Sequence, residues 1–174
     1  MRARAFLKAV TVDRDDALER FLQVLAAGHV KWCLVGGLAV NAYAEPVVTL
    51  DLDLVVVEGA AESLVMAATT AGFVSQTFTH STNLTSPGSD LRIQIQRDPR
   101  YSTFVDRAQP RSVLGLTMPV AAVEDVLQGK IWAFQDIHRR GSKRQKDLAD
   151  IARLLETFPG LRERVPADVL QRLV

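Results

Sequence analysis

Two aspartates, Asp51 and Asp53, lie in the most strand-like stretch of the chain, LDLDLVVV at residues 50–57. Residues two apart on a strand point to the same face, so we expect the carboxylates side by side, about 7 Å apart along the strand. Like charges entering a buried strand need a neutralising partner. A divalent cation is one such partner, and two such ions can clamp a phosphoryl transfer. The simpler interpretation is that the acids mark the solvated end of the strand.

A glycine pair, Gly36 and Gly37, follows the apolar stretch KWCLV at residues 31–35, which we expect to be a buried strand. Glycines let a ligand approach the backbone closely, and the helix expected over residues 38–44 would present unpaired N–H groups to an anion. The pair fits neither G-x-G-x-x-G nor a Walker A loop, so Rossmann and P-loop sites lack support. An ordinary tight turn is the alternative. With D-x-D about fifteen residues later, the order of elements favours a phosphate site beside metal carboxylates.

Lys130 shares one face of an expected helix over residues 122–139 with the apolar residues Val126 and Leu127. A lysine that points inward needs an anionic partner, or it must extend its charged end to solvent. A triphosphate would satisfy it, and so would a carboxylate in a structural salt bridge. The residues alone leave both partners open.

Residues 138–146, HRRGSKRQK, contain five Lys or Arg side chains. Arg139 and Arg140 are explained by the helix that we expect to end there, since its dipole stabilises cations. Lys143 and Arg144 instead open the next helix, where the dipole disfavours them. This mismatch favours phosphate or RNA binding, so Lys143 and Arg144 are candidate nucleotide-binding residues.

Asp147 lies in a second expected helix over residues 143–158, after a break at Gly141 and Ser142. It follows Lys143 by one turn, so an i,i+4 contact between them is the plain interpretation. The apolar positions of this helix leave Asp147 beside the core face.

Length and composition predict one domain over residues 1–174, with a sheet-containing core over about 1–120 and C-terminal helices over about 121–174. The single cysteine, Cys33, excludes a disulfide framework and multi-cysteine metal sites. No apolar run approaches the roughly 18 residues of a membrane span, so we expect a soluble, cytoplasmic protein without a membrane partner. Residues 97–146 hold ten Lys or Arg and five Asp or Glu, a mildly basic half in a chain of net charge +1. That imbalance suits a polyphosphate or nucleic acid, although surfaces reach it by chance.

The remaining elements complete an α+β, or mixed α/β, pattern. Besides those above, the sequence predicts a helix from an Asp13 N-cap to Gly28, a helix over 60–71, strands over 73–79 and 90–96 joined by a turn at 86–89, and a short helix over 167–173.

Four motifs, taken in order, resemble the nucleotidyltransferase fold, in the branch of AbiEii-type abortive-infection toxins and their small relatives. The first two are LVGGLAVNAY and TLDLDLVV, and the later two are LQGKIWA and RQKDLADIARLL. The resemblance covers roughly residues 30 to 156. It implies a small mixed sheet flanked by helices, with a C-terminal helical segment.

The resemblance also implies the roles of individual residues. Gly36 and Gly37 would hold the triphosphate of an NTP. Asp51 and Asp53 would hold Mg2+, Lys130 would contact the phosphates, and Asp147 would complete the catalytic site.

The implied activity is transfer of a nucleoside monophosphate to an acceptor hydroxyl, with tRNA or another RNA as the acceptor and a protein antitoxin as a partner. Many members of the fold carry a third carboxylate on a later strand, where this chain has Gln94. Asp90 has the same strand parity but lies about 13 Å away. Two alternatives therefore stay open. One is a non-catalytic binding protein of the same fold, and the other is a transferase with a small-molecule acceptor such as an aminoglycoside.

Overall fold

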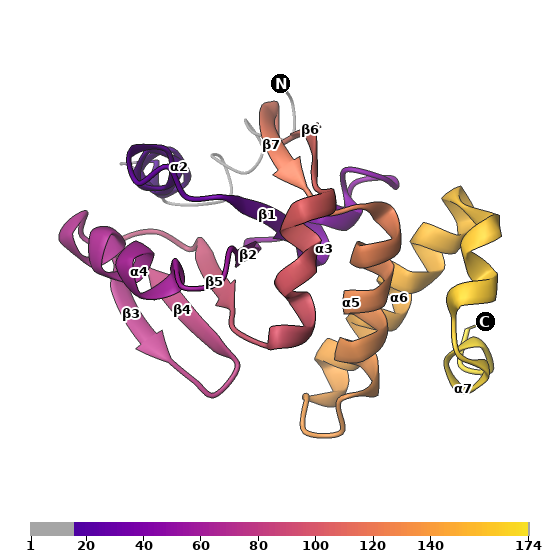
Figure 1. Cartoon of the computed structure of the whole chain (residues 1–174). Coiled ribbons are helices and arrows are strands. Elements are labelled where there is room, and N and C mark those ends of the chain that lie inside the picture. Colours follow the sequence, from indigo (N-terminus) through magenta and orange to yellow (C-terminus); the bar gives the residue numbers. More distant parts are fainter. Residues whose placement is uncertain (1–15, 174) are drawn as a thin grey trace.

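The computed structural model describes residues 16–173, and within them one mixed sheet is flanked by helices (Figure 1). The expected fold class, α+β with a mixed sheet and C-terminal helices, is confirmed. In chain order the elements are α2 (Ala17–Ala27), β1 (Trp32–Val35), α3 (Gly36–Val40), β2 (Asp51–Val56), α4 (Ala61–Thr70), β3 (Val74–Thr77), β4 (Ser81–Thr85), β5 (Arg92–Gln96), the 3-10 helix η1 (Pro99–Arg107), β6 (Gln109–Val113), β7 (Leu116–Val120), α5 (Val123–Gln135), α6 (Gly141–Thr157), the 3-10 helix η2 (Pro159–Arg164) and α7 (Ala167–Leu170).

The strand that carries D-x-D, β2, lies in the middle of the sheet, whose order is β3-β4-β5-β2-β1-β7-β6. It runs antiparallel to β1 and parallel to β5. Leu54, Val55 and Val56 are all buried, so both faces of the later half of β2 are covered, as the apolar run predicts. Asp51 and Asp53 lie in the first half, on the face opposite Leu52 and Leu54.

The helices gather at the two ends of the molecule. Figure 1 shows α2 and α4 together at one end, and α5, α6 and α7 at the other, with α3 between the sheet and α5. Within residues 16–173, no helix combines the length and the apolar composition that a membrane crossing requires.

Several predicted boundaries are wrong in informative ways. The N-cap of α2 is Asp16, whose side chain accepts a hydrogen bond from the backbone N–H of Glu19 at 3.3 Å, whereas the predicted cap, Asp13, lies outside the described residues. Helix α3 begins at Gly36 itself rather than after the glycine pair. The left-handed conformation of Gly36 (φ 70°) allows this abrupt change from strand to helix.

The break between the last two long helices also lies earlier than predicted. Helix α5 ends at Gln135 and α6 begins at Gly141, so Gly141 opens α6 instead of separating the helices. Arg139 lies in the connection and Arg140 is the N-cap of α6. The helix-end explanation for these two arginines is therefore wrong.

Three strands were not predicted: β4, β6 and β7. The strands expected over 73–79 and 90–96 are joined through β4, because β3 pairs with β4 and β4 with β5. Strand β4 is mostly polar (STNLT), and Pro110 and Pro119 of β6 and β7 weaken a strand interpretation. The helix expected over 167–173 is shorter, ending at Leu170.

Candidate active site

One cavity of about 80 Å³ is lined by residues from β1, α3, β2, β5, η1, α5, the connection before α6, and α6 itself. Five of its lining residues are charged side chains, which come from strands, helices and loops far apart in the sequence. The lining includes Gly36, Asp53, Gln94, Lys130, Arg139 and Asp147. The predicted neighbourhood of glycine, aspartate and lysine therefore exists in the fold.

Asp53 is the carboxylate of D-x-D that faces this cavity. Among residues 16–173 no cation lies within ion-pair distance of it. Burial raises its pKa to about 6, with nearby Asp51 adding to the shift and Lys130, Arg139 and Lys143 opposing it. Asp53 is thus a partly buried anion surrounded by cations at longer range.

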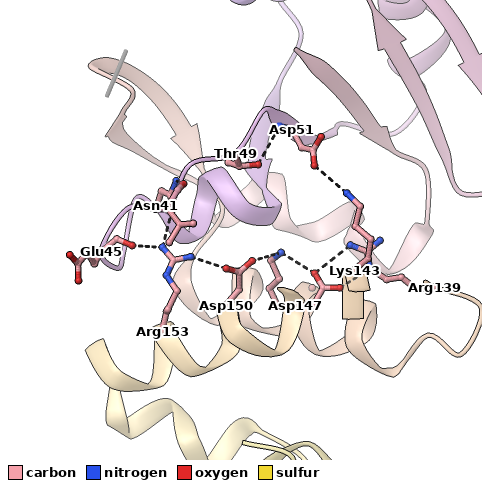
Figure 2. A network of polar contacts seen from close by, with 12 residues as sticks. Asn41, Glu45, Thr49, Asp51, Arg139, Lys143, Asp147, Asp150 and Arg153 are labelled. Atoms are coloured by element: carbon pink, nitrogen blue, oxygen red, sulfur yellow. Dashed lines mark hydrogen bonds and ion pairs between the residues drawn. The ribbon is translucent and has the colours of Figure 1, made fainter. Parts of the chain in front are cut away.

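Asp51 is already neutralised by two cations. Its Oδ1 lies 2.7 Å from Nε of Arg92 on β5, and its Oδ2 lies 3.4 Å from Nζ of Lys143 on α6. Figure 2 shows Lys143 reaching Asp51 from the helix below. The backbone N–H of Asp51 donates to Oγ1 of the buried Thr49 at 3.3 Å. A metal ion on Asp51 would compete with both cations.

The two glycines have different surroundings. A β-carbon on Gly36 would collide with the Asp53 side chain, whose Cβ and Cγ would both lie 2.9 Å away. A β-carbon on Gly37 would meet Thr49 at an ordinary 3.7 Å. The close approach of the Asp53 side chain therefore requires glycine at position 36, whereas the contact of Thr49 does not require glycine at position 37.

Lys130 points inward as predicted, with 8% of its side chain exposed, and its partners are carboxylates. Its Nζ lies 3.1 Å from Oδ1 of Asp147 and 2.7 Å from Oδ2 of Asp150. Burial alone would lower the pKa of Lys130, but the two aspartates outweigh burial and raise it. Sequence reasoning missed Asp150, although its spacing of three from Asp147 places both on one face of α6.

The network continues along α6 to the loop before β2 (Figure 2). Arg153 donates to Asp150 at 2.7 Å and to the side chain of Asn41 at 2.9 Å, and it also contacts the backbone carbonyl of Glu45. Asn41 in turn bonds both backbone polar groups of Val47. Helix α6 thereby fixes the loop that leads into D-x-D.

Arg139, which the sequence analysis explained as a helix-end cation, lines the cavity. Its Nε donates to Oδ2 of Asp147 at 2.6 Å, and its Nη2 to Oδ1 at 3.4 Å. The plain interpretation that pairs Asp147 with Lys143 is therefore wrong: Asp147 holds Lys130 and Arg139, while Lys143 pairs with Asp51. The excess of cations in this segment was the only signal in the sequence.

Arg144 is not brought to this cavity. Its Nε donates to the backbone carbonyl of Phe134 at 2.6 Å, and its guanidinium lies 5.2 Å from the centre of the Phe134 ring. It lines a separate hollow between α5, α6 and α7, together with Ile137 and Arg172.

Gln94 lies directly beside Asp53 on the neighbouring parallel strand and lines the same cavity. Within the described chain, no cluster of three or more acidic, histidine or cysteine side chains is arranged to hold a metal. The available donor set is therefore Asp51 and Asp53. Mg2+ is commonly bound by one or two carboxylates together with substrate phosphates, so this pair fits Mg2+ bound jointly with a nucleotide.

Comparison with known families gives a match to the family described as "Nucleotidyl transferase AbiEii toxin, Type IV TA system" over residues 62–174. That range includes Lys130 and Asp147, whereas the glycine pair and D-x-D precede it. A comparison with curated protein sequences finds no match.

Solved structures with a similar fold include two antibiotic adenylyltransferases. ANT(2")-Ia in complex with adenylyl-2"-tobramycin has a TM-score of 0.64 and 12% identity, and the match covers 89% of this chain and 95% of the ANT(2")-Ia chain. The lincomycin-bound lincosamide adenylyltransferase LnuA has a TM-score of 0.55 and 12% identity, and the match covers 80% of this chain and 97% of the LnuA chain. JHP933 from Helicobacter pylori has a TM-score of 0.54 and 17% identity, and the match covers 91% of this chain and 70% of the JHP933 chain. These similarities show a nucleotidyltransferase fold.

Proposed function

Because the chain belongs to the AbiEii family of nucleotidyltransferases, we propose that it transfers a nucleoside monophosphate from an NTP to an acceptor hydroxyl and releases pyrophosphate. The observation that carries this proposal is the cavity in which Asp53 faces Gly36, Lys130 and Arg139. Asp53 forms no ion pair with any cation of residues 16–173, and it lies beside a backbone that lacks a β-carbon and close to two cations. Such surroundings suit a metal-bound polyphosphate.

In this proposal the residues in and beside the cavity have separate tasks. Asp51 and Asp53 hold Mg2+, which when bound neutralises the triphosphate and withdraws charge from the reacting phosphorus. Gly36 and Gly37 leave room for the phosphate chain. Lys130, fixed by Asp147 and Asp150, stabilises the charge that develops on the phosphates.

For the acceptor we propose RNA, with the end of a tRNA as the first candidate to test. Arg92 and Lys143 both pair with Asp51. Arg140 and Lys146 are exposed and belong, like Lys143, to the basic segment at residues 138–146. These cations would attract a polyanion such as RNA, whereas they would repel a polycationic drug. A protein antitoxin is the partner that the family's toxin–antitoxin setting suggests.

The test is transfer of label from each of the four α-phosphate-labelled NTPs to RNA in the presence of Mg2+. The Asp51→Ala/Asp53→Ala variant should lose transfer, and the exposed Asp90→Ala should serve as a matched control that retains it. Binding of an NTP without transfer to any acceptor would favour the non-catalytic alternative. Transfer to an aminoglycoside but not to RNA would contradict the proposed acceptor.

A further inference from the structure

The cations of the cavity differ in how much of their charge is available to a ligand. Lys130 is almost fully enclosed and contacts two carboxylates, so most of its charge is already balanced. Arg139 lines the same cavity with 35% of its side chain exposed, and it contacts one carboxylate, which it shares with Lys130. A ligand that enters the cavity meets Arg139 with more accessible charge than Lys130.

The geometry points to Arg139 as a phosphate-binding residue for the triphosphate of the nucleotide, held in position by Asp147. This inference rests on the proposed function and adds to it a residue and a division of roles. Arginine offers five N–H donors in a planar fork that matches phosphate oxygens. Nε and Nη2 are directed to Asp147, and among residues 16–173 Nη1 makes no hydrogen bond.

Asp147 has the features of a positioning residue rather than a metal ligand. Only 1% of its side chain is exposed, and its two oxygens together accept from Lys130 and twice from Arg139. Binding a metal there would require releasing both cations inside a nearly closed site, which is costly for each buried charge. Asp147 therefore acts through the cations that it orients.

The test uses inorganic tripolyphosphate with Mg2+ as the calorimetric ligand, since it has the phosphate chain without any base. Arg139→Gln should weaken binding about tenfold or more, the size expected for charge-assisted hydrogen bonds. Arg139→Lys, which keeps the charge but loses the fork, should fall between wild type and Arg139→Gln. The matched control is Arg162→Gln, which removes the same charge from an exposed arginine of η2 that does not line the cavity, and it should change affinity by less than about twofold.

Asp147 is tested by a double-mutant cycle with Arg139. If Asp147 acts largely through Arg139, Asp147→Asn should weaken tripolyphosphate binding less in the Arg139→Gln background than in wild type. Two losses that simply add would contradict this positioning role.

The other outcomes separate the inference from the proposed function. If wild type binds Mg-tripolyphosphate and Arg139→Gln binds it equally well, the role of Arg139 is overturned while the phosphate site stands. The role of Arg139 in phosphate binding is also overturned if Arg139→Gln raises only the KM for an RNA acceptor. If wild-type protein binds no Mg-tripolyphosphate, both the phosphate site and this inference fail.

Discussion

The side chain of Asp53 occupies the space that a β-carbon on residue 36 would need. This relationship joins the end of β1 to the middle of β2 and explains why a glycine stands at the strand-to-helix junction. It also brings the backbone of α3 against the carboxylate that faces the cavity. Gly36 and Asp53 therefore line the same cavity.

Alanine substitutions should distinguish the two glycines. Gly36→Ala introduces both a collision with Asp53 and a β-carbon at φ 70°, so it should cost about 2 kcal/mol or more of unfolding free energy and abolish Mg-tripolyphosphate binding. Gly37→Ala meets only ordinary contacts within a helix and should change stability by less than about 1 kcal/mol. Urea denaturation and calorimetry measure both. Equal tolerance of the two substitutions would contradict the contact with Asp53.

The raised pKa of Asp53, about 6, predicts opposite pH effects on metal binding and on stability. Mg2+ affinity should fall as the pH drops below about 6, because the carboxyl becomes protonated. Between about pH 4 and 6 the folded chain holds a proton that the unfolded chain has lost, so stability should decline as the pH rises through this window.

Asp53→Asn should remove that pH dependence. At pH 7 it should raise the unfolding free energy by on the order of 1 kcal/mol, because it removes the desolvated charge, while Mg2+ binding is lost. Urea denaturation of both proteins at pH 5 and pH 7 provides the comparison. A variant that is less stable than wild type at pH 7 would contradict the environment assigned to Asp53.

Lys130→Ala should lower the free energy of unfolding by about 3 kcal/mol, since it leaves Asp147 and Asp150 buried with one cation fewer. It should also weaken Mg-tripolyphosphate binding in the fraction that stays folded. Chemical denaturation gives the first quantity and calorimetry gives the second. The exposed Lys31→Ala, which lies outside the cavity lining, is the control and should change neither. A Lys130→Ala variant of unchanged stability would show that the buried network does not depend on this lysine.

Arg92→Gln should strengthen the binding of free Mg2+ by a few fold. Arg92 occupies one oxygen of Asp51, and a cation that binds there must displace it. The effect should shrink at high ionic strength, because 61% of the Arg92 side chain is exposed. Calorimetric titration at two salt concentrations tests this. Weaker Mg2+ binding in the variant would mean that Arg92 supports the site instead of competing with the metal.

The parts of the site that could be predicted from sequence depend on local rules. Because residues two apart on a strand point to the same face, Asp51 and Asp53 were predicted to share one face of their strand. Because Lys130 lies on the apolar face of its helix, it was predicted to point toward the protein interior. The partners of these residues depend on how α5 and α6 pack. Arg139 reaches the cavity, and Asp150 reaches Lys130, because the connection between these helices begins at Asp136, which no local pattern in the segment indicates.

The same distinction holds for the fold. Strand β2 has a long apolar run and was predicted nearly to its ends. Strand β4 is polar and follows the edge strand β3, so its alternation carries little hydrophobic signal. Strand β6 forms by pairing with β7, and β7 pairs in turn with β1, although each of the two strands contains a proline.

The proposed activity requires that Asp51 and Asp53 bind a nucleotide together with Mg2+. Calorimetric titration of each NTP, with and without Mg2+, against wild type and the Asp51→Ala/Asp53→Ala variant tests it most directly. We predict Mg-dependent binding of at least one NTP to wild type, and its loss in a variant that remains folded. Equal binding to both proteins, or no binding of any NTP to folded wild type, would contradict the claim.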